Sequence, residues 1–165
     1  MYAAFYQSPA GVDPAWTFLM TGIVEELDSG DNLGLQERFS AYVLDTLGAG
    51  LRDRVAALLA YIPDGEVAWD KLQNDPTIRK TEGDDSVQTV LMLSSYPVSS
   101  GGKDFWVAFA YFPIDEADPS IEGIYAVGAA PRTEAGDSPQ ERALFAWLDS
   151  FDVAATTPPG VFLPE

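Results

Sequence analysis

The sequence predicts an α+β fold in which N-terminal helices pack with a small antiparallel β-meander and a C-terminal helix. Apolar residues recur at helical spacing over about 13–63. The period changes to that of strands over about 86–128, where the connections are short and turn-like. A last helical segment, about 138–151, follows a strong start signal. The length of 165 residues fits one globular domain that spans the whole chain, 1–165.

The N-terminal half is expected to form helices. Asp13 offers an N-cap and Pro14 a first helical residue, which predicts a helix over about 13–27. The stretch LQERFSAYVLDTL, residues 35–47, continues at helical spacing. A third helix is expected from about 51 to 62, and with the second it predicts a helical hairpin.

Three strands are expected in the second half, over 87–93, 105–112 and 121–127. Alternation in the middle strand separates two apolar faces. One face holds the larger residues Phe105, Val107, Phe109 and Tyr111, and the other holds Trp106, Ala108, Ala110 and Phe112. A face with two central alanines admits a helix closely, so the strand is expected to be covered on both sides.

The remaining segments carry weaker signals. The stretch EVAWDKL, residues 66–72, is compatible with a strand or a helical turn. Residues 74–86 are polar and contain turn formers, so they are expected to be mostly loop, and the tail 154–165 is expected to be irregular. By contrast, Ser138, Pro139 and Glu141 form a capping box with proline at the first helical position.

Charge is the most unusual bulk property, because 26 acidic residues face nine basic ones and give a net charge of −17. Such a surface repels nucleic acid and anionic lipid, so neither direct nucleic-acid binding nor membrane binding is expected. It favours a basic partner, cations or a very salty solvent. The N-terminus does not resemble a signal peptide and no apolar run reaches membrane-spanning length, which predicts a cytoplasmic protein.

Catalytic motifs fit poorly. The chain has no Cys and no His, which removes the commonest general base and the commonest metal ligands. Ser100 and Lys103 match an S-x-x-K pattern, but the two glycines between them indicate a hairpin turn. An acidic loop that starts at Asp28 lacks the EF-hand spacing. We therefore expect no cofactor and no metal, and the sequence leans away from an enzyme.

The function that the sequence favours is a non-catalytic acidic protein that masks a basic partner surface, such as an inhibitor, an immunity protein or an anti-defence accessory. Anionic fields speed encounter with cationic partners. Mimicry of DNA fits less well, because the acidic residues are scattered rather than gathered in long runs. The expected contact residues follow the middle strand: Asp115, Glu116, Asp118 and Glu122.

Two alternatives remain open. The even spread of acidic residues also suits a halophilic cytosolic domain whose charge is an adaptation to salt and whose function is unrelated. The third possibility is a small ligand-binding domain or enzyme with an aromatic pocket. Its expected lining residues are Trp16, Trp69, Phe109, Tyr111 and Tyr125.

Overall fold

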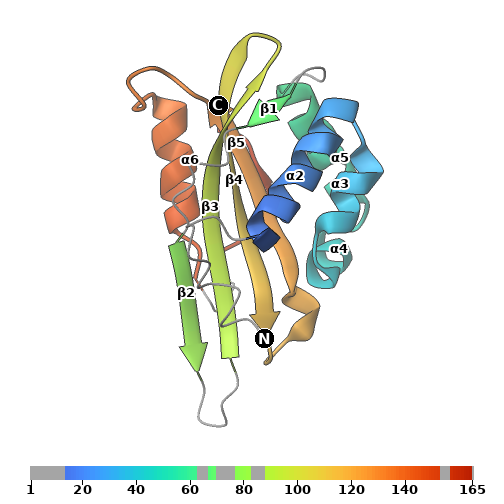
Figure 1. Cartoon of the computed structure of the whole chain (residues 1–165). Helices are drawn as coiled ribbons and strands as arrows, with labels where there is room; N and C mark the ends of the chain where they lie inside the picture. Colours follow the sequence, from blue (N-terminus) through green and yellow to red (C-terminus); the bar gives the residue numbers. More distant parts are fainter. Residues whose placement is uncertain (1–13, 63–66, 70–76, 83–87, 153–156, 165) are drawn as a thin grey trace.

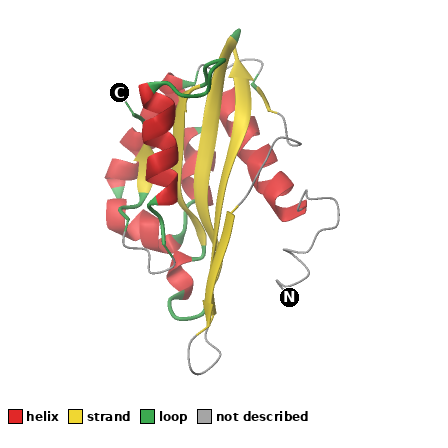
Figure 2. Ribbon diagram, turned by 90° about the vertical axis from the view of Figure 1, so that its left-hand side faces the viewer, coloured by secondary structure: helices red, strands yellow, loops and turns green. Residues whose placement is uncertain are grey.

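A computed structural model describes residues 14–62, 67–69, 77–82, 88–152 and 157–164, with side chains described in these ranges except at 14–18, 69 and 77–82. It confirms the α+β class. One sheet lies between a single helix on one face and a group of helices on the other (Figure 1). Figure 2, turned by 90°, shows helices in front of the strands and behind them.

The helical group comprises α2 (Pro14–Ser29), α3 (Asn32–Arg38), α4 (Ala41–Leu47) and α5 (Ala49–Tyr61). The predicted helix over 35–47 is interrupted, because Phe39 has extended backbone and forms a parallel bridge to Ile124 of the sheet. The N–H of Ser40 donates to the carbonyl of Ile124 at 3.0 Å, and the Ser40 hydroxyl then caps α4 by accepting from the N–H of Val43. A pairing with a distant strand therefore outweighs local helical spacing.

The sheet contains the predicted meander of β3 (Gln88–Ser100), β4 (Lys103–Asp115) and β5 (Gly123–Pro131), all antiparallel. Gly101 and Gly102, with φ of 57° and 79°, form the tight turn between β3 and β4, as expected for the Ser100–Lys103 stretch.

Three further strands extend the predicted meander. Two of them pair with the outer edge of β3: β1 (Ala68–Trp69) and β2 (Thr77–Glu82). The strand β1 lies in the stretch 66–72, which was compatible with a strand or a helical turn, whereas β2 corrects the expectation of a loop over 74–86. The tail also contributes a strand, β6 (Gly160–Phe162), which pairs in parallel with β5. Each is short or polar, so its strand conformation depends on the neighbour rather than on its own pattern.

The C-terminal helix α6 (Pro139–Asp149) begins with the predicted capping box at Ser138 and Glu141. It covers the small-residue face of the sheet, where Ala108 of β4 pairs with Gly128 of β5. A Cβ atom at Gly128 would lie 2.7 Å from Cζ3 of Trp147, so the helix approaches the strand more closely than a larger residue would allow. On the opposite face, Tyr61 of α5 contacts Phe105, with ring centroids 6.0 Å apart.

Candidate functional site

The acidic turn after β4 brings together the four predicted contact residues, but their carboxylates also hold the turn in shape. Asp115 is only 4 % exposed. Its carboxylate accepts hydrogen bonds from the Thr89 hydroxyl at 3.3 Å and from the N–H of Asp118 at 2.9 Å. The carboxylate of Asp115 therefore makes its hydrogen bonds largely within the protein.

The other three carboxylates are exposed and are also held by hydrogen bonds. Glu116 accepts from the N–H of Gln88 at 2.8 Å. Glu122 accepts from the N–H of Asp115 at 3.0 Å, and Asp118 accepts from the N–H and hydroxyl of Ser120 at 3.2 and 2.6 Å. Each carboxylate is thus fixed in orientation at the surface and keeps acceptor capacity for a further donor.

The aromatic residues predicted to line a pocket lie elsewhere. Phe109 and Tyr125 are buried in the core, where Phe109 stacks on Tyr96 with centroids 6.0 Å apart. Tyr111 is half-buried. None of these three lines either of the two pockets described below. The side chains of Trp16 and Trp69 lie outside the described residues.

Tyr125 makes a structural contact. Its hydroxyl donates to the carbonyl of Thr157 at 2.6 Å, which fixes the segment that enters β6. Burial, together with Tyr42 and Asp152 nearby, raises the pKa of Tyr125 to about 12, so the hydroxyl stays protonated as a donor.

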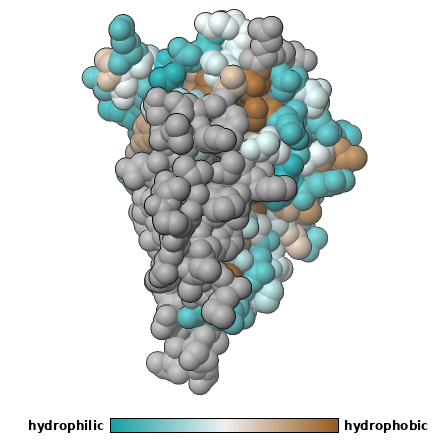
Figure 3. All heavy atoms as spheres, viewed as in Figure 1, coloured by the Kyte–Doolittle hydropathy of each residue, from teal (hydrophilic) through white to brown (hydrophobic). Residues whose placement is uncertain are grey.

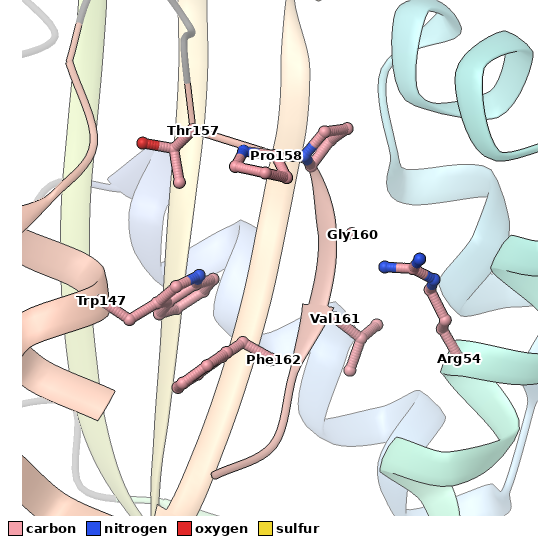
Figure 4. A pocket seen from close by; sticks show the side chains of 8 residues that line it. Arg54, Trp147, Thr157, Pro158, Gly160, Val161 and Phe162 are labelled. Atoms are coloured by element: carbon pink, nitrogen blue, oxygen red, sulfur yellow. The ribbon is translucent and has the colours of Figure 1, made fainter. Parts of the chain in front are cut away.

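A pocket of about 220 Å³ lies along β6 (Figure 4). Arg54 of α5 approaches it from one side and Trp147 of α6 from the other. The segment that contains β6 supplies the remaining lining residues: Thr157, Pro158, Pro159, Gly160, Val161 and Phe162. The rings of Trp147 and Phe162 stack with centroids 4.9 Å apart and an angle of 10°. Sequence reasoning missed this site because its parts lie far apart in the chain.

A second pocket, with a larger volume of about 440 Å³, lies at the end of the sheet near the turn between β3 and β4. Its lining residues are Tyr61, Lys103, Asp104, Phe105 and Pro131. Asp104 also faces Arg132, with Oδ1 and Nη2 3.7 Å apart. The pocket therefore carries both charges at its rim and shows no preference for one sign of ligand.

One fully buried carboxylate, that of Glu141, belongs to neither pocket. It accepts hydrogen bonds from Nε1 of Trp106 at 3.0 Å, from the hydroxyl of Thr133 and from the N–H of Ser138 at 3.2 Å. Arg132 lies above the Trp106 ring, 5.7 Å from its centroid. This arrangement joins β4 to α6 and is a structural contact.

Comparison with known proteins gives no further assignment: no protein-family model matches the chain, and no curated protein matches it in sequence. Among the described residues, no group of three or more acidic side chains is placed to hold a metal ion. In the same part of the chain, no helix combines the length and apolar character needed to cross a bilayer.

Proposed function

We propose that this chain is a non-catalytic acidic protein that binds and masks a basic surface of a partner protein, with the turn after β4 as part of the contact. The observation that carries the proposal is the set of exposed carboxylates of Glu116, Asp118 and Glu122, each held in place by a hydrogen bond from a backbone N–H group. Side chains that are ordered before binding lose less conformational entropy on association.

The wider surface supports the same function. The net charge of −17 produces an attractive field for cationic partners. The described surface on one face is mostly hydrophilic, with apolar residues in small patches (Figure 3). Among the described side chains, the large apolar residues that are exposed are Leu33 and Leu44. A partner that recognises this surface therefore has to do so mainly through charge.

A salt titration separates this function from adaptation to a salty solvent. Thermal unfolding is followed at fixed pH from zero to several molar KCl. A binding protein is expected to be stable at low salt, and its thermal stability is expected to change little beyond about 0.15 to 1 M KCl, where screening saturates. A steady gain in stability up to molar KCl would instead assign the charge to solvent adaptation and overturn the proposal.

The contact surface is tested with two variants of equal net charge. One neutralises the turn with Glu116→Gln, Asp118→Asn and Glu122→Gln, where the amide oxygen keeps an acceptor for each backbone donor. The other neutralises three exposed acidic residues of the helical layer, with Glu25→Gln, Asp45→Asn and Asp53→Asn. A basic protein captured by the wild type is expected to be lost only with the turn variant. Equal retention by both variants would remove the turn from the contact.

A further inference from the structure

We propose that the outer edge of β6, with which no described strand pairs, binds a short extended peptide of a partner protein, with an acidic side chain directed at Arg54 and an apolar side chain against Trp147 and Phe162. The peptide would extend the sheet by one strand. This inference goes beyond the function proposed above, because it rests on a cation and a strand edge rather than on the acidic surface.

The strand β6 lies at an edge of the sheet. It ends the strand order, and its described pairing is with β5 on one side. A terminal strand presents N–H and C=O groups that can pair with another chain. The pocket follows this strand, because a continuous segment, 157–162, supplies most of its lining. An elongated site of this kind suits a backbone better than a compact molecule.

Different side chains lie on the two sides of this edge. Figure 4 shows Val161 directed toward the side of Arg54, and Phe162 directed toward the side of Trp147. Successive side chains of an added strand would also alternate between these two sides. One peptide residue would then face Arg54 and the next would face the stacked rings. The alternation of a strand therefore matches the two chemically different walls.

The charge of the pocket is positive. Arg54 is the one charged residue that lines it, and among the described residues no carboxylate lies within ion-pair distance of its guanidinium. In a protein with 26 acidic and nine basic residues, a cation at this position favours an anionic group on the ligand. A carboxylate suits the guanidinium because it can accept two parallel hydrogen bonds.

Arg54 approaches the strand β6 closely. A Cβ atom at Gly160 would lie 3.2 Å from Nη1 of Arg54 and 2.9 Å from Cδ1 of Leu47. Gly160 also has φ of +118°, which disfavours any other residue. Glycine therefore leaves the space in which Arg54 lies beside the β6 backbone. The volume of about 220 Å³ is below the range of about 300–1,000 Å³ usual for small-molecule sites, which favours individual side chains as occupants.

Selection from a library of short random peptides tests the chemistry of the site. Peptides that bind the wild type are expected to share an acidic residue next to an aromatic or branched apolar residue. With Arg54→Glu, the selected peptides are expected to carry Lys or Arg at the acidic position. The control is Arg52→Glu on the same helix, since Arg52 is exposed and does not line the pocket. Absence of any shared motif, or the same motif with Arg54→Glu, would overturn the proposal.

Binding through the backbone is tested with one selected peptide made synthetically. Arg54→Gln is expected to weaken its affinity about tenfold, the effect of losing a hydrogen bond to a charged group. N-methylation of the peptide at every second residue is expected to abolish binding in one register and to spare it in the other. Affinity that is unchanged in both registers would exclude strand addition. The turn variant of the previous section is expected to bind this peptide normally, so the two proposals fail separately.

Discussion

Nε1 of Trp106 donates a hydrogen bond to Oε2 of Glu141 at 3.0 Å, and this bond joins the middle strand β4 to the first turn of α6. The Glu141 side chain is 0 % exposed, yet it also accepts from the Thr133 hydroxyl and the Ser138 N–H. Local capping of a helix and long-range docking of that helix therefore depend on the same carboxylate.

The substitution Glu141→Gln is expected to lower the free energy of unfolding by about 1–3 kcal/mol. The reason is that the NH2 group of the new amide is a hydrogen-bond donor, and it would face the donor groups from which the carboxylate accepts. Urea denaturation measures the change. The control is Glu134→Gln, which changes an exposed residue close by and is expected to alter stability by less than about 0.5 kcal/mol. Equal effects of the two substitutions would show that the buried hydrogen bonds contribute nothing.

The contribution of Glu141 is also expected to depend on pH. Burial opposes ionisation, but hydrogen bonds from Thr133, Trp106 and Ser138 outweigh it and lower the pKa of Glu141 from 4.5 to about 2. A group whose pKa is lower in the folded state stabilises the protein above its unfolded-state pKa. That stability is lost as the pH falls from 4.5 toward 2.

The measurement is urea denaturation of the wild type and of Glu141→Gln at a series of pH values. The difference in unfolding free energy between the two proteins should be fully present at neutral pH and should shrink as the pH falls through this range. Effects of pH that the two proteins share cancel in this difference, so the difference isolates the contribution of Glu141. A difference that stays constant with pH would contradict the assigned shift.

Replacing Gly22 of α2 by alanine is expected to have an unusual effect on stability, because an ion pair lies against this glycine. Nε of Arg38 donates to both carboxylate oxygens of Glu26, at 2.5 and 2.6 Å. A Cβ atom at Gly22 would lie 2.0 Å from Nη2 of Arg38, so alanine would displace the guanidinium from its partner. Inside a helix, replacing glycine by alanine otherwise stabilises by about 1 kcal/mol.

Gly22→Ala is therefore expected to destabilise the wild type but to stabilise a protein that already carries Arg38→Ala. The effect of Gly22→Ala is measured by urea denaturation in each background, which forms a double-mutant cycle. The two effects are expected to differ by about 1 kcal/mol or more. If Gly22→Ala has the same effect in both backgrounds, the ion pair does not restrict this position.

The features that the sequence predicted well are those whose signals are local. The capping box at Ser138 and Glu141 lies within four consecutive residues, and the structure confirms it. The strand 105–112 carries its own alternation, which predicted two covered faces. The sequence did not predict that the register between β4 and β5 shifts between Ala110 and Tyr111. Such a shift depends on the neighbouring strand and leaves no mark in the strand itself.

The features that were missed depend on distant partners. The break at Phe39 requires Ile124, and the strands β2 and β6 require the edges of β3 and β5. The β6 pocket joins Arg54 to Trp147, and neither residue had a local pattern that pointed to the other. The acidic turn was found because its four residues lie within eight positions, 115–122. The hydrogen bonds that hold these carboxylates required coordinates.

The contact between α6 and β5 gives a final prediction, in which two glycines respond with opposite sign. A Cβ atom at Gly128 would lie 2.7 Å from Trp147 and 2.8 Å from Cδ1 of Leu144, whereas one at Gly50 of α5 would meet no atom within 4 Å. Gly128→Ala is expected to lower the unfolding free energy by about 1–3 kcal/mol through overpacking. Gly50→Ala is expected to raise it by up to about 1 kcal/mol. Urea denaturation of both variants measures the effects, and a Gly128→Ala protein as stable as the wild type would mean that α6 can move away from β5 without cost.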